Sequence, residues 1–91
     1  MAICRIIESG ITPEQYDEMR SRLGIGDSPP AGASLHLAAN GEDGKIRIVE
    51  VWDSRDEAER WAEKVTAARQ EAGFGAPASI TYFEVYNLRQ A

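Results

Sequence analysis

The chain has 91 residues, the size of one small domain, and its 43% hydrophobic and 27% charged residues are typical of a globular protein. The net charge is −5, and no cluster of basic residues is present. Because binding to a phosphate backbone needs such a cluster, we expect no nucleic-acid partner. No apolar run approaches the ~20 residues of a membrane-spanning helix, so we expect no membrane partner either.

The N-terminal segment, residues 2–8, is predicted to be a strand. It lacks the charged and apolar regions of a secretory signal, and the single cysteine, Cys4, cannot form an internal disulfide. We therefore expect a reducing, cytoplasmic location. Strand alternation places Cys4 on one face with Ala2 and Ile6, and because no nearby residue would activate the thiol, we expect it to be buried and unreactive.

The first helix begins after Thr12, which stands at the N-cap with Pro13 next to it and Gln15 three residues later. This arrangement is typical of a capping box, and Gly24 is a typical helix end. The loop over residues 24–32 contains two prolines and is longer than the ~4–6 residues usual for a connection, and long loops often border sites. One apolar stripe at helical spacing runs along the helix: Tyr16, Met19 and Leu23.

Three more strands and a second helix are predicted in the rest of the chain. Strands are predicted at 33–40 and 46–52 around the turn sequence of residues 40–44, a helix at 55–72 and a final strand at 79–88. The order β-α-β-β-α-β predicts an α+β, ferredoxin-like fold for a single domain over residues 1–91, with a four-stranded antiparallel sheet and both helices on one face.

The predicted strands carry apolar residues on both faces. In residues 46–52, for example, Ile48 and Trp52 lie on one face and Val49 and Val51 on the other. A sheet with one solvated face would alternate apolar and polar residues. Because two helices on one face cannot cover both, we expect a homodimer in which two sheets meet face to face.

The junction Val51–Trp61 joins the third strand to the second helix. Ser54 stands at the N-cap, Glu57 is placed to complete a capping box, and Trp61 follows on the buried stripe of the helix. This string resembles the strand–helix junction of the antibiotic biosynthesis monooxygenase-like family, whose members are dimeric α+β barrels. The resemblance spans about a dozen residues closely and the rest of the chain only in architecture, and it agrees with the predicted dimer.

The resemblance implies a pocket between the sheet and the helices, touched by Tyr16 and Trp61 and closed by the loop over residues 24–32. The haem-free branch of the family oxidises electron-rich aromatic polyketides with dioxygen and no prosthetic group. A haem-degrading branch uses a histidine ten residues after the tryptophan and an asparagine on the first strand. This chain has Glu71 at the former position and no asparagine in its first strand, so we expect no haem cofactor. The aromatic side chains expected to bind a ligand are Tyr16, Trp52, Trp61 and Tyr82, although aromatic residues equally suit a core or an interface.

His36 is the only histidine of the chain, and it cannot form a metal site without partner ligands at suitable spacing. An even number of residues in the hairpin loop would place it opposite Val49, and an odd number opposite Ile48 or Glu50. Opposite Glu50 it could serve as an acid or base near neutral pH. The alternative is a hydrogen-bonded or interface histidine.

Glu50 lies in the most apolar strand, where an unpaired carboxylate would cost several kcal/mol, by order of magnitude. Arg5 and Arg47 are its candidate partners in a structural salt bridge. A catalytic base with a raised pKa is the alternative.

Three functions fit these observations. The first is a cofactor-independent enzyme of secondary metabolism, monooxygenase-like or cyclase- or isomerase-like, acting on a flat, aromatic or polyketide-like metabolite with His36 and Glu50 as catalytic residues. The second is a non-catalytic ligand-binding or accessory dimer, and the third a haem-binding or haem-degrading protein. The fold alone does not decide among them.

Overall fold

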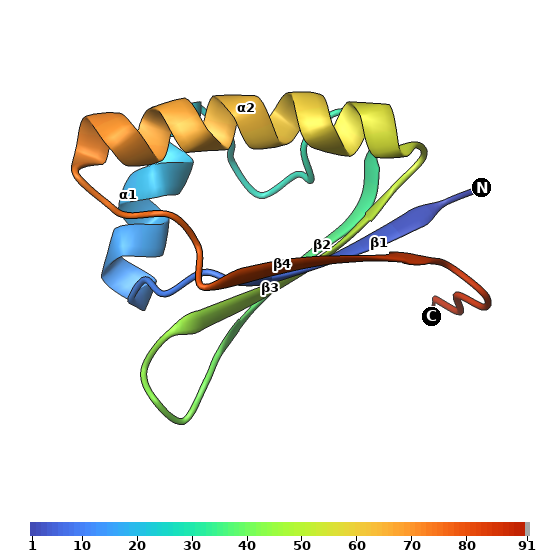
Figure 1. The fold of residues 1–91 in the computed structure, drawn as a ribbon, viewed down its shortest axis with the longest axis horizontal. Helices are drawn as coiled ribbons and strands as arrows, with labels where there is room; N and C mark the ends of the chain where they lie inside the picture. Colours follow the sequence, from blue (N-terminus) through green and yellow to red (C-terminus); the bar gives the residue numbers. More distant parts are fainter. Residues whose placement is uncertain (91) are drawn as a thin grey trace.

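The computed structural model describes residues 1–90. Both helices lie on the same side of a four-stranded antiparallel sheet, with strand order β2-β3-β1-β4 (Figure 1). This is the ferredoxin-like α+β fold predicted from the sequence. The elements in chain order are β1 (Ile3–Glu8), α1 (Pro13–Leu23), β2 (Ala33–Asn40), β3 (Ile46–Trp52), α2 (Arg55–Ala72) and β4 (Ser79–Glu84).

The helix starts follow from local hydrogen bonds. Thr12 and Gln15 form the full capping box of α1, because each side chain accepts a hydrogen bond from the backbone N–H of the other. At α2 only half of the predicted box is present. The Ser54 hydroxyl accepts from the Glu57 N–H, but Glu57 Oε2 is buried without a hydrogen-bond partner. The Glu57 side chain lies instead against Gly32, where a Cβ would clash with it.

The last strand is shorter than predicted. The sequence indicated a strand over residues 79–88, whereas β4 ends at Glu84, paired with Ile3. Val85 N–H still donates to the Ala2 carbonyl, but β1 begins only at Ile3 and offers no further partner. The chain therefore leaves the sheet, and Tyr86 is fully exposed.

The hairpin between β2 and β3 settles the register that the sequence left open. Five residues, 41–45, separate the two strands, an odd number, and His36 lies opposite Glu50. Arg5 of β1 lies opposite Glu50 on the other side of β3. Three polar side chains from three neighbouring strands therefore point to the same face of the sheet, the face beneath the helices.

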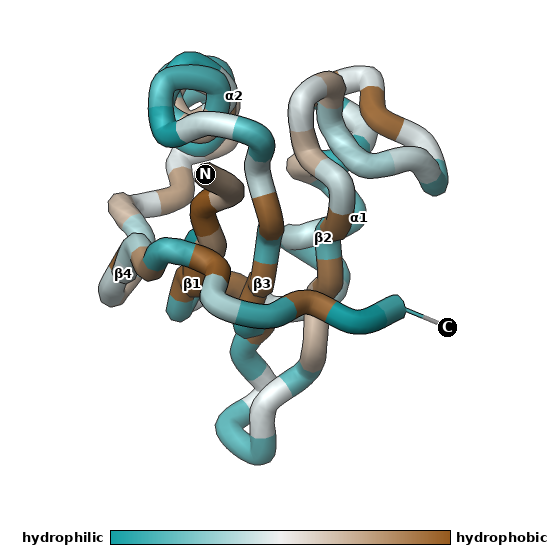
Figure 2. Tube along the Cα trace, turned by 90° about the vertical axis from the view of Figure 1, so that its right-hand side faces the viewer, coloured by the Kyte–Doolittle hydropathy of each residue, from teal (hydrophilic) through white to brown (hydrophobic). Residues whose placement is uncertain are grey.

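The two faces differ in how well they are covered. On the helix face, Ile7 and Trp52 pack beneath the helices and are buried, as is Ala58 of α2. The face turned away from the helices, here called the open face, leaves apolar side chains uncovered in the single chain: Ile6, Leu37 and Phe83 are 36%, 53% and 52% exposed. Hydrophobic residues recur along the strands (Figure 2). Within residues 1–90, no helix combines the length and apolarity needed to cross a membrane.

Candidate functional site

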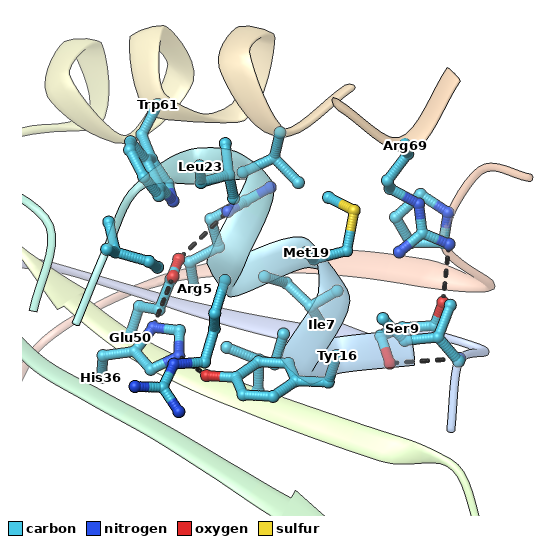
Figure 3. A pocket seen from close by; sticks show the side chains of 16 residues that line it. Arg5, Ile7, Ser9, Tyr16, Met19, Leu23, His36, Glu50, Trp61 and Arg69 are labelled. Atoms are coloured by element: carbon cyan, nitrogen blue, oxygen red, sulfur yellow. Dashed lines mark hydrogen bonds and ion pairs between the residues drawn. The ribbon is translucent and has the colours of Figure 1, made fainter. Parts of the chain in front are cut away.

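A cavity of about 60 Å³ lies between the sheet and the two helices. It is called the inner cavity here and has room for about two water molecules, at roughly 30 Å³ each. Strands β1, β2 and β3 form its floor and α1 and α2 its roof (Figure 3). Most of its wall is apolar, including Ile7, Met19, Leu23, Trp61 and Val65.

A cluster of hydrogen bonds centred on Glu50 forms the polar part of this wall. Glu50 is 2% exposed, and its Oε1 accepts from Arg5 Nη1 at 3.0 Å and from Trp52 Nε1 at 3.1 Å. Its Oε2 lies 3.0 Å from His36 Nδ1. The carboxylate thus has three donors, which offset the cost of burying it.

These contacts decide the protonation of Glu50. Burial alone would raise the pKa of this carboxyl group, but the hydrogen bonds from His36 and Trp52 and the charge of Arg5 together hold it below its usual range. Glu50 is therefore ionised at neutral pH and is not a base with a raised pKa. Arg5 is the partner in the predicted salt bridge, whereas Arg47 pairs with Asp43 at the hairpin.

An ionised Glu50 also fixes the tautomer of His36. A carboxylate can only accept, so the neutral form of His36 carries its proton on Nδ1 and leaves Nε2 as an acceptor. The Tyr16 hydroxyl lies 2.6 Å from Nε2 and therefore donates to it. Burial is the main cause of a raised pKa for Tyr16, which keeps this phenol protonated. Glu50, His36 and Tyr16 thus form one chain of hydrogen bonds that ends at a phenol on the cavity wall.

A second cavity of about 290 Å³, here called the outer cavity, lies beneath the loop over residues 24–32. It shares Tyr16, Arg20, Ile25 and His36 with the inner cavity. Tyr16 and His36 therefore stand between the two spaces, and the loop borders the outer one. Arg20 holds this loop by donating to the Gly26 carbonyl and the Asp27 carboxylate.

The structure brings together some of the side chains predicted to bind a ligand and separates others. Tyr16, His36, Glu50 and Trp61 all line the inner cavity. Trp52 is fully buried beside Trp61, with ring centroids 6.5 Å apart, and is not part of the cavity wall. Tyr82 also lies outside the wall, where Arg55 of α2 stacks on its ring at 4.2 Å. Within residues 1–90, no group of three or more metal-ligating side chains is present.

Arg69 is a residue of the wall that the sequence did not predict. Arg69 is 7% exposed and donates to the Ser9 carbonyl at 2.9 Å (Figure 3). It also donates to the Gly75 carbonyl at 2.7 Å. It joins the end of α2 to the segments before β4 and after β1. Arg69 follows Trp61 at i+8 and Val65 at i+4, a spacing that places it on the same face of the helix, but its charge sets it apart from the apolar stripe.

Among solved structures, the fold matches that of a protein from Chloroflexus aurantiacus J-10-fl, whose assignment as an antibiotic biosynthesis monooxygenase is itself provisional. The two chains are 21% identical, with a TM-score of 0.69, and the match covers 99% of this chain and 98% of that one. This likeness confirms the resemblance at the level of fold. No protein-family model and no curated protein sequence matches the chain.

Proposed function

We propose that this chain, which shares its fold with a structure assigned provisionally as an antibiotic biosynthesis monooxygenase, is a cofactor-independent enzyme that oxidises a flat aromatic substrate. The observation that carries the proposal is the chain of hydrogen bonds from Glu50 through His36 to Tyr16, set in the wall of a largely apolar cavity. Perturbed titratable groups in such a cavity are typical of sites that move protons.

In the proposed reaction, a phenol of the substrate takes the place of the Tyr16 hydroxyl at His36 Nε2. His36 accepts the phenol proton, and the Glu50 carboxylate stabilises the resulting imidazolium. Glu50 thus acts as a positioning residue and His36 as the base. The apolar wall alone would disfavour the phenolate that forms. The positive charge that His36 gains, held in place by the Glu50 carboxylate, offsets this cost.

The anion then passes one electron to dioxygen, giving a phenoxyl radical and superoxide. These recombine at a ring carbon, and His36 returns its proton to the new peroxide. Loss of water breaks the O–O bond and the C–H bond at that carbon and leaves a quinone. One phenol and one dioxygen thus give one quinone and one water.

The proposal includes a homodimer formed through the open face. Leu37 and Phe83, on the two outer strands, are each about half exposed there, and a second copy would cover them. Such an assembly leaves the inner cavity free, because the cavity lies on the opposite face of the sheet.

The test measures dioxygen uptake and quinone absorbance with a panel of naphthols and anthrones. His36→Ala is expected to lower turnover by roughly 10²–10⁴-fold, the usual loss for a removed acid–base group. His36→Gln keeps a group of similar length as a control for packing, and Glu18→Gln on the exposed side of α1 controls for surface charge. Full turnover by a folded His36→Ala protein would exclude His36 as the base.

A second candidate is a non-catalytic binding protein. It is favoured by the small inner cavity, in which the Tyr16 hydroxyl already occupies His36 Nε2. In that case the panel compounds would bind without dioxygen uptake, and Tyr16→Phe would change affinity alone. An enzyme of the proposed kind would consume dioxygen in proportion to quinone formed.

A further inference from the structure

The inner cavity is too small for the aromatic ring of the proposed substrate. Its volume of about 60 Å³ holds about two water molecules, at roughly 30 Å³ each. The outer cavity, at about 290 Å³, lies close to the lower end of the roughly 300–1,000 Å³ typical of small-molecule sites. Tyr16 and His36 border both cavities, so a phenol at His36 Nε2 can place its ring in the outer one. The inner cavity is therefore left for a smaller molecule.

The wall of the inner cavity offers such a molecule chiefly apolar contacts. Ile7, Met19, Leu23 and Trp61 line it, as Figure 3 shows, and Val65 of α2 adds a further apolar side chain. Apolar cavities in folded proteins stay dry and bind apolar guests such as xenon. The wall therefore suits a small apolar guest.

The polar groups of this wall already have partners in the protein. The Ser9 hydroxyl donates to the Ile46 carbonyl at 2.6 Å, and both carboxylate oxygens of Glu50 and Nε2 of His36 accept hydrogen bonds. Arg5 Nε lacks a partner but is covered by neighbouring atoms, so a water in the cavity cannot reach it. Because a buried water needs about 2–4 polar partners, the wall holds a water poorly.

The charges of the wall favour a guest that becomes negative as it reacts. They are three guanidinium groups and one carboxylate: Arg5, Arg20, Arg69 and Glu50. Glu50 is paired with Arg5, whereas Arg69 donates to two backbone carbonyls. Since a protein interior screens charge weakly, this excess of positive charge stabilises an anion formed in the cavity and has little effect on a neutral molecule.

We infer that the inner cavity is the dioxygen site of the proposed reaction, and that the substrate ring binds across Tyr16 and His36 in the outer cavity. Dioxygen is a neutral, apolar diatomic molecule that fits the space of two waters. The phenolate formed at His36 loses one electron and dioxygen gains it, so that superoxide arises beside the guanidinium groups. Because the phenol displaces the Tyr16 hydroxyl from Nε2, the ring then faces the inner cavity, where the two radicals recombine. The electron transfer rests on the proposed function, whereas binding of dioxygen depends on the cavity alone.

The first experiment uses dioxygen itself as the probe, because the molecule is paramagnetic and speeds the relaxation of nearby nuclei. Methyl ¹H–¹³C NMR spectra of the native protein are compared under pressurised oxygen and under nitrogen. Ile7 and Ile46 form a matched pair, since they are 6% and 5% exposed but only Ile7 belongs to the wall. The methyl groups of Ile7 should show the greater increase in relaxation rate, together with those of Leu23 and Val65. An increase at Ile46 as large as that at Ile7 would overturn the inference.

A second experiment fills the cavity. Val65→Phe adds a volume comparable to that of the cavity and should abolish the effect of oxygen at Ile7. It should also raise KM for dioxygen about tenfold, a loss of about 1.4 kcal/mol of binding, and change KM for the aromatic substrate little. If this variant fails to fold, Val65→Ile adds one methyl group and should shift both readouts in the same direction. Ala67→Phe, at an exposed position of the same helix, is the matched control and should behave as the native protein does. A folded Val65→Phe protein with native relaxation at Ile7 and native KM for dioxygen would overturn the inference.

Two results separate this inference from the proposed function. Dioxygen uptake by the native protein without preferential relaxation at Ile7 would overturn the inner cavity as the dioxygen site and leave the proposed oxidation intact. Preferential relaxation at Ile7 without uptake for any compound of the panel would uphold dioxygen binding in the cavity and refute the proposed oxidation.

Discussion

The face of the sheet beneath the helices buries a charged pair, Arg5 and Glu50, whereas the face turned away from them leaves Leu37 and Phe83 half exposed to water. Packing alone favours the reverse, because burial of charge is costly and exposure of large apolar groups gains nothing. A chain of 91 residues has little stability to spare. The inner face thus buries a charged pair at a cost in stability, and the outer face exposes apolar groups that the second sheet of the proposed dimer would cover.

The largest effect is expected on the inner face. Glu50→Ala leaves the Arg5 guanidinium buried without its partner and should lower the free energy of unfolding by about 3–5 kcal/mol. Chemical denaturation monitored by the fluorescence of Trp52 and Trp61 measures this change. Glu18→Ala, which removes an exposed pair with Arg22, is the control and should have little effect. A small loss for Glu50→Ala would mean that the buried Arg5 does not depend on Glu50 as its partner.

A smaller effect is expected on the open face. Leu37→Arg places a charge in the proposed interface twice per dimer and should weaken association by about 3 kcal/mol in total, measured by sedimentation. Cys4, on the same face, lies in register with Val51 and Phe83, and burial raises the pKa of its thiol. If the proposed dimer forms, the reaction of Cys4 with a thiol reagent should be slow in the native protein and faster in Leu37→Arg. A native protein that sediments as a monomer at micromolar concentration would refute the proposed dimer through the open face.

The smallest effect is expected from acid. Because the folded state lowers the pKa of Glu50, its contribution to stability is present above the ordinary glutamate pKa of about 4.3 and is lost as the pH falls through the lower, folded value. Glu50→Gln should remove this part of the acid transition. Asp43, whose pKa is lowered mainly by the Lys45 N–H, lies at the exposed hairpin, and Asp43→Asn should alter the transition less. An unchanged acid transition in Glu50→Gln would show that Glu50 does not control it.

The sequence predicts the fold well because its signals are local. The capping residues Thr12 and Ser54 and the turn over residues 40–44 each act over a few positions and lie where predicted. The last strand was predicted too long because its length depends on where β1 begins, which is a contact between the two ends of the chain. Local propensity carries no information on that contact.

The candidate site was predictable in part. His36 and Glu50 stood out as a single histidine and a charge in an apolar strand, but their meeting depended on the parity of the hairpin loop. The hydrogen bond from Tyr16 to His36 links a helix to a strand, and no spacing in the sequence indicates it. Trp52 and Trp61 pack against each other, yet only Trp61 reaches the cavity. Their positions in the folded structure decide this, and their residue type does not.

The order of strands has a consequence for how the protein is made. The first strand of this domain, β1, is central in the sheet, and its outer partner β4 is the last of the four strands in chain order, so that Ile3 pairs with Glu84. Pairing of such distant segments closes a large loop and is slow compared with local contacts. A nascent chain that lacks β4 presents one side of β1 as an unpaired edge, a template for aggregation. Completion of the sheet must therefore wait until β4 has left the ribosome.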